Sequence, residues 1–156
     1  MPAEYQPPPL DRDAPSVQSH LTMLQGIVSR LASNSAACKT WCVTLVSALA
    51  VVVAQSGPPK LLMIAALPIV IFCALDCYYL GLERRFRECY DGFVRKLHTG
   101  TARIEDAFVV APKLALRGAF IEAIQAALSF SVWPFYVGLA VLLLLLGRVL
   151  ASASVV

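Results

Sequence analysis

Two ionisable residues interrupt the apolar stretches of this sequence, Lys39 near the start of one and Asp76 near the end of the next. The turn between these stretches, SGPPK, is short, so they are predicted to pair as antiparallel helices. With Gln55 and Lys60 flanking the turn, Lys39 and Asp76 lie at equal depth, about 28 Å from it. A lysine and an aspartate at this depth of a bilayer lower their cost by pairing. We therefore predict a hairpin ion pair, with an ion-contact or gating role for Asp76 as the alternative.

The same register brings four cysteines to similar depths, with Cys38 opposite Cys77 and Cys42 opposite Cys73. Four thiols can bind zinc or form disulfides, but no zinc-ribbon spacing is present and the site lies near the reducing cytoplasm. Small, polarisable side chains also pack two helices together closely. Packing is the preferred interpretation, and no metal or cofactor is predicted.

A narrow polar stripe precedes the last apolar segment. It consists of Gly118, Glu122, Gln125 and Ser129, which follow a 4-3-4 spacing. This spacing places them on one face of a helix. The stripe either faces water on an interfacial helix or lines a water-filled pathway in an assembled pore.

Arginines and aromatic residues alternate in the segment ERRFRECYDGFVRKLH. Such a run suits phosphates and stacked bases, and equally suits a cytoplasmic helix beside anionic lipid. The candidate phosphate contacts are Arg84, Arg85, Arg87, Arg95 and Lys96. Neither histidine, His20 nor His98, has catalytic partners in the sequence pattern, and we expect both to be solvated. The sequence contains no catalytic constellation, so it does not predict an enzyme.

The composition predicts an integral membrane protein. Of the 156 residues, 58% are hydrophobic, and the mean hydropathy is +0.70, whereas soluble domains are about 45–50% apolar. Windows of roughly 20 apolar residues, enough to cross a bilayer, occur at 36–55, 61–80 and 132–150. Trp133-Pro134 is the predicted break before the last of them.

Basic residues favour one orientation of these spans. Between the second and third windows lie Arg84, Arg85, Arg87, Arg95, Lys96, Arg103, Lys113 and Arg117, whereas Lys60 and Arg148 are isolated at the other side. Lysine and arginine concentrate in cytoplasmic segments. The sequence thus predicts a multi-pass protein of the bacterial inner membrane, with its N-terminus inside and its C-terminus outside.

Two apolar seams continue beyond the predicted bilayer. One comprises Leu21, Leu24, Val28, Leu31, Ser35, Cys38, Cys42 and Leu45, and the other Tyr79, Leu82, Phe86, Tyr90, Phe93 and Leu97. Both have helical period and require partners. We predict that Leu82–Leu97 forms an interface in a homo-oligomer, a tetramer or larger. Asn34 and Ser35 lie among small residues and are assigned to packing and helix register, with ligand contact as the alternative for Asn34.

The predicted fold class is an all-α integral membrane protein. Its parts are a proline-rich disordered tail (1–15), an antiparallel transmembrane helix hairpin with cytoplasmic helical extensions (16–98), a cytoplasmic connector (99–113), and an amphipathic helix followed by a third transmembrane helix (114–156).

The helix LTMLQGIVSRLASNSAACKTW, the short hairpin and the run YYLGLERRFRECYDGFVRKL resemble SLATT domains, over roughly residues 20–98. That resemblance implies an effector of bacterial anti-phage systems that forms oligomeric pores or perturbs the membrane. It also implies a nucleotide or oligonucleotide signal, or a signalling enzyme encoded nearby. We therefore expect a regulated ion channel that depolarises the membrane, or alternatively a non-conducting anchor that recruits a cytoplasmic partner. The third span exceeds the two-span pattern, which leaves the pore-lining helix open.

Overall fold

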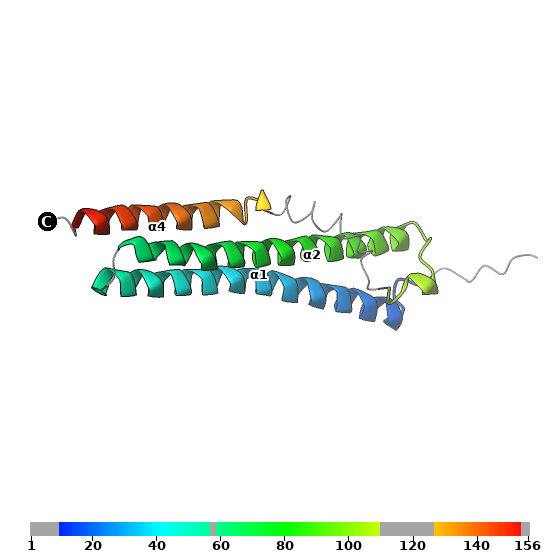
Figure 1. Cartoon of the computed structure of the whole chain (residues 1–156). Helices are drawn as coiled ribbons and strands as arrows, with labels where there is room; N and C mark the ends of the chain where they lie inside the picture. Colours follow the sequence, from blue (N-terminus) through cyan, green and yellow to red (C-terminus); the bar gives the residue numbers. More distant parts are fainter. Residues whose placement is uncertain (1–9, 57–58, 110–126, 154–156) are drawn as a thin grey trace, which may run out of the picture.

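The computed structural model describes residues 10–56, 59–109 and 127–153, and these residues form helices and turns without strands (Figure 1). The order is α1 (Pro15–Ser56), the 3-10 helix η1 (Pro59–Ala65), α2 (Ala66–His98), the 3-10 helix η2 (Ile104–Asp106) and α4 (Trp133–Ala153). Within this part of the chain, three helices are long and apolar enough to cross a membrane.

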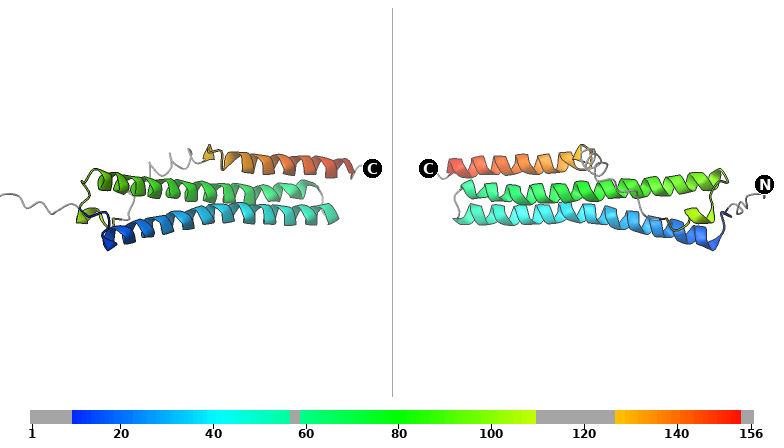
Figure 2. Two further views of the ribbon diagram at one scale, coloured as in Figure 1. Left: turned by 180° about the vertical axis from the view of Figure 1, so that it is seen from behind. Right: turned by 45° about the vertical axis from the view of Figure 1, so that its right-hand side comes forward.

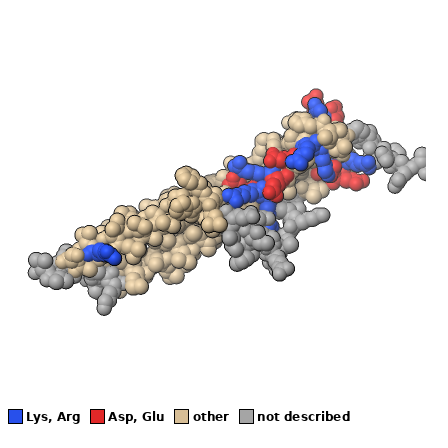
Figure 3. Space-filling view, turned by 90° about the horizontal axis from the view of Figure 1, so that it is seen from above, with Lys and Arg blue, Asp and Glu red and all other residues tan. Residues whose placement is uncertain are grey.

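Helices α1 and α2 lie side by side in opposite directions along most of their length, and α4 lies beside them at the end where they are joined (Figures 1 and 2). Charged side chains gather in the other half of the molecule, around the start of α1 and the end of α2, and the half that carries α4 is largely uncharged (Figure 3). The molecule is therefore elongated and divided along its axis into an apolar half and a charged half.

Prolines set two of the helix starts. Pro68 lies in the first turn of α2, after a 3-10 segment, and Pro134 is the second residue of α4. Proline lacks an N–H group and obstructs the carbonyl four residues earlier, so it is tolerated in a first helical turn and disrupts a continuing helix. The predicted break at Trp133-Pro134 is present, but residues 128–132 form turns instead of continuing the amphipathic helix expected up to Ser131.

The seam predicted on α1 is largely the one that α2 covers. Leu24, Leu31, Ser35, Cys38 and Cys42 are buried, and Val28 is half-buried. The burial then passes to Val46 instead of the predicted Leu45, which is 44% exposed. A straight helix has 3.6 residues per turn, so a seven-residue repeat drifts around it and the contact stripe moves to the next residue.

The seam predicted on α2 for contacts between copies is partly used inside one chain. Phe93 and Leu97 are buried with Val17 and Ala102, and Leu10, Ala14 and Leu21 pack against this cluster. Leu82, Phe86 and Tyr90 are half-buried. The expectation of an intermolecular seam is thus wrong for Phe93 and Leu97, because the start of the connector, the segment before α1 and the first turns of α1 cover them within the chain.

Candidate functional site

A buried polar cluster joins α1 to α2 near the middle of the molecule. Lys39 Nζ lies 2.6 Å from Asp76 Oδ2, and the Ser35 hydroxyl donates a hydrogen bond to Asp76 Oδ1. Lys39 Nζ also approaches Ser35 Oγ, at 3.4 Å. The Asp76 side chain is 0% exposed and that of Lys39 is 21% exposed. The ion contact that the hairpin register predicts is therefore present, with Ser35 as a third member.

The helical period explains how one carboxylate meets both partners. Ser35 and Lys39 are four residues apart on α1 and so lie on the same face, one turn above the other. Asp76 reaches between them from α2. A buried carboxylate without a cation and a hydrogen-bond donor costs several kcal/mol, and this arrangement supplies both. Sequence reasoning placed Ser35 in the packing seam and missed its bond to Asp76, although its i, i+4 spacing from Lys39 was a usable signal.

The cysteines surround this cluster on its apolar side. Cys38, Cys42 and Cys77 are buried, Cys73 is half-buried, and all are free thiols. Cys42 and Cys77 belong to the main apolar cluster with Val46, Ala65, Ile69, Val132 and Tyr136. Among the residues that the structure describes, no three histidine, cysteine or acidic side chains are grouped to hold a metal ion. Cys42, Cys77 and the adjacent Cys73 thus contribute to the apolar packing of the helices.

Helix α4 contacts α2 one turn before Asp76, through Tyr136, a residue that the sequence analysis did not single out. The Tyr136 hydroxyl donates a hydrogen bond to the backbone carbonyl oxygen of Phe72, at 3.1 Å, and the Tyr136 side chain is only 4% exposed. Phe72 precedes Asp76 by one helical turn. Contact between α4 and the hairpin therefore reaches the turn that carries the buried acid.

The predicted polar stripe lies mostly outside the described residues, which include only Ser129 of its four members. Ser129 is half-buried in the turn before α4, where its carbonyl oxygen accepts hydrogen bonds from the N–H groups of Val132 and Trp133. Gly118, Glu122 and Gln125 lie outside the described residues. Ser129 itself is not on a helix, contrary to the prediction.

The basic residues proposed as phosphate contacts do not form one cluster. Arg87 pairs with Glu83 at 2.6 Å, and Lys96 pairs with Asp106 at 2.5 Å. Arg85 is buried, Arg84 is half-buried and Arg95 is exposed. The five positions extend over about 18 Å of helix. Two of the five cations are therefore paired with carboxylates within the chain, and the five remain candidate contacts.

One polar groove does exist between the charged halves of α1 and α2. It has a volume of about 400 Å³ and is lined by Gln25, Val28, Ser29, Ala32, Arg87, Tyr90 and Asp91. The Gln25 side-chain amide donates to the Tyr90 hydroxyl at 3.1 Å across the two helices. Asn34, the other candidate ligand contact on α1, is half-buried and does not line this groove.

A comparison of the chain with models of protein families, with curated proteins and with solved structures finds no match.

Proposed function

We propose that this protein is an oligomeric membrane effector that forms a regulated ion channel or pore. The observation that carries the proposal is the Lys39–Ser35–Asp76 cluster, buried between two helices that have the length and composition to span a bilayer. Ionisable groups inside membrane segments are costly, and they commonly mark ion pathways or elements that move. In this proposal, Asp76 is the residue that holds α1 and α2 in one register.

The distribution of charge supports the orientation proposed for the bilayer. The uncharged half, with α4 and the ends of α1 and α2 that face the turn, lies in lipid, and the charged half extends into the cytoplasm (Figure 3). The N-terminus is then inside and the C-terminus outside, by the positive-inside rule. The membrane is the bacterial inner membrane, and α1 and α2 form a transmembrane hairpin whose helices continue as a cytoplasmic stalk.

The third helix supports assembly into a ring of four or more copies. Apolar side chains of α4 are extensively exposed in the single chain, including Leu142, Leu144 and Val149. Lipid covers some of this surface, and neighbouring copies cover the rest. The Tyr136–Phe72 hydrogen bond connects α4 to the turn that carries Asp76. Movement of the stalk thereby reaches the helix that stands nearest to a shared axis.

The signal is proposed from the resemblance to SLATT domains together with the polar groove. A nucleotide, an oligonucleotide or a partner enzyme binds the stalk, with Arg87 and Tyr90 among the residues that line the available groove. Opening then depolarises the cell during phage infection. The role in phage defence rests on the resemblance to SLATT domains. The groove supports only the position at which the signal would bind the stalk.

The first test is membrane potential, followed with a voltage-sensitive dye in bacteria that express the chain with and without its genomic neighbours. Depolarisation that the neighbours switch on or suppress is the expected result. Asp76→Asn should change the threshold of this depolarisation, whereas the control Glu88→Gln, at an exposed position of the stalk outside the groove, should not. A stable potential under every condition, including phage challenge with the protein verified in the membrane, would exclude the channel.

The second candidate is a non-conducting anchor that recruits a cytoplasmic protein. It is favoured by the mixed charges of the stalk and by exposed apolar residues in the connector, Ile104, Phe108 and Val109. Glu122→Ala and Gln125→Ala distinguish the two candidates. If the polar stripe that contains Glu122 and Gln125 lines a pore, these substitutions should change its conductance or ion selectivity. An anchor should tolerate both substitutions.

A further inference from the structure

His20 is the one described histidine that is buried, at 1% exposure, although it lies in the charged half of the molecule. This overturns the expectation that it is solvated. Its ring meets Phe93 of α2 edge-on, with centroids 4.5 Å apart, and Phe108 of the connector at 5.9 Å. His20 therefore stands where α1, α2 and the connector come together.

One hydrogen bond ties the connector to this ring. The backbone N–H of Phe108 donates to His20 Nδ1, at 3.1 Å. The bond requires a lone pair on Nδ1, so the imidazole must be neutral with its proton on Nε2. Protonation of Nδ1 would place two N–H groups against each other and remove the acceptor that this amide has in the structure.

The connector holds Phe108 in a conformation that favours release. Phe108 has a φ of 66°, in the left-handed region, which costs a non-glycine residue about 1–2 kcal/mol. Its side chain is also 58% exposed, so detaching it from His20 gives up little apolar burial. The hydrogen bond and the ring contact together keep this strained residue in place.

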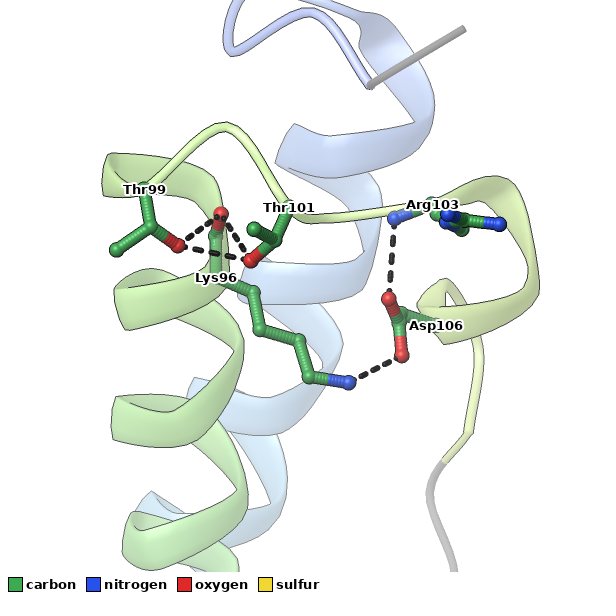
Figure 4. A network of polar contacts seen from close by, with 5 residues as sticks. All are labelled: Lys96, Thr99, Thr101, Arg103 and Asp106. Carbon is green, nitrogen blue, oxygen red and sulfur yellow. Dashed lines mark hydrogen bonds and ion pairs between the residues drawn. The ribbon is translucent and has the colours of Figure 1, made fainter. Parts of the chain in front are cut away.

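The first part of the connector, residues 99–106, is held by bonds that do not titrate near neutral pH. The Leu10 N–H donates to the Ala102 carbonyl oxygen at 3.0 Å, and the Ala102 N–H donates to that of Lys96 at 3.2 Å. Figure 4 shows Lys96 reaching Asp106, whose other oxygen accepts from the Arg103 N–H at 3.0 Å. Protonation of His20 would therefore free the stretch after Asp106 and leave the preceding turn docked.

The charged groups near His20 are compatible with a neutral imidazole. The charged and titratable residues near it on the elements packed against it are Arg12 and Asp13 before α1, Glu88, Cys89, Tyr90, Asp91, Arg95, Lys96 and His98 around Phe93 on α2, and Arg103, Glu105 and Asp106 in the connector. Lys96 and Asp106 neutralise each other, and Arg12 donates to the His98 carbonyl oxygen at 3.4 Å. Burial alone lowers the pKa of His20 below its ordinary value of 6.5.

We propose that His20 is a proton-operated latch, which holds residues 107–109 against α1 when neutral and releases them when its imidazole takes up a proton from solution. Residues 107–109 lie between α2 and α4 in the sequence. Acidification of the compartment that contains the stalk therefore loosens the link between the stalk and α4. This inference stands independently of channel activity.

The size of the effect follows from linkage. If the closed latch does not bind the proton and the open latch has an ordinary histidine, with a pKa near 6.5, the open population rises up to about 10-fold between pH 7.5 and pH 5.5. The lowered pKa of His20 fixes the direction of this pH dependence. The closed latch is favoured above pH 6.5 and loses stability as the pH falls below 6.5.

The test uses the full chain in lipid nanodiscs and hydrogen exchange at pH 5.5 and 7.5, with rates corrected for intrinsic exchange. Protection of residues 107–109 should fall several-fold at the lower pH, and that of residues 99–102 should change little. His20→Asn is the key variant, because its side-chain oxygen can accept the Phe108 N–H bond and does not titrate. It should remove the pH dependence, whereas the matched variant His98→Asn should keep it.

An NMR titration of the histidine rings in the unaltered chain guards against a variant that misfolds. The His20 ring should titrate below the ordinary histidine value of 6.5. Protection that stays constant while His20 takes up its proton would overturn the latch, as would a pH dependence that survives in His20→Asn.

Discussion

Replacing Lys39 with alanine leaves Asp76 fully buried with Ser35 as its hydrogen-bonding partner. Removal of one member of a buried ion pair typically costs about 3–5 kcal/mol, because the other charge stays uncompensated. Because Ser35 still donates to the carboxylate, we expect Lys39→Ala to cost about 3 kcal/mol of stability, at the lower end of this range.

The reverse substitution should cost less. Lys39 keeps 21% of its side chain exposed, so in Asp76→Ala its ammonium group can turn toward water on its flexible stem. We expect a loss of about 1–2 kcal/mol there. The double variant carries neither charge and should resemble Asp76→Ala, which gives a coupling energy of about 3 kcal/mol between the two residues.

The assay is reversible unfolding in lipid bicelles, with the four proteins of the cycle compared under the same conditions. Lys39→Ala should lose more stability than Asp76→Ala, because it leaves the more deeply buried charge uncompensated. A coupling energy below about 0.5 kcal/mol, or equal costs for the two single variants, would refute the asymmetric burial on which the reasoning depends.

Three further predictions concern other contacts of the chain. Tyr136→Phe removes the hydrogen bond to the Phe72 carbonyl and should cost about 1 kcal/mol, seen as faster proteolysis at the turn before α4 with α1 and α2 unaffected; equal cleavage rates would rule out this bond as the tether. Asp106→Asn should weaken docking of the connector by at most about 1 kcal/mol at pH 7, measured as exchange protection of residues 103–106. Hydrogen bonding from Lys96 lowers the pKa of Asp106 below 3.8. The difference in protection between Asp106→Asn and the unaltered chain should therefore disappear as the pH falls below 3.8, and a difference that persists in acid would contradict a role for the Asp106 carboxylate in docking. Phe86→Ser should reduce the size of the oligomer in detergent without unfolding the chain, and an unchanged size would argue against a stalk interface at this residue.

Much of the fold was predictable because the relevant signals are local. Hydropathy located the three helices that can span a membrane, and the short proline-containing turn fixed the register that brings Lys39 opposite Asp76. Proline chemistry placed the start of α4. Each of these inferences needs only the properties of a continuous stretch and the constant rise of a helix, so no knowledge of distant residues was required.

The errors occurred where segments far apart in the sequence meet. Phe93 and Leu97 were expected to contact other copies, and His20 was expected to face water. Phe93 and Leu97 are covered by the start of α1, the segment before it and Ala102, and His20 is covered by Phe93 and Phe108. Helical period reports that a face is apolar, but it carries no information about which segment covers that face.

The sequence by itself therefore determined the class of protein, its helices and the charge pair between them, since hydropathy and helix periodicity act residue by residue. Only the tertiary structure decided that Ser35 completes the Asp76 site, that Tyr136 binds α4 to the same turn, and that His20 is closed in by Phe108. These contacts depend on the angles and separations at which three elements pack. Such distances are set by the sum of many side-chain contacts, which no single stretch of sequence encodes.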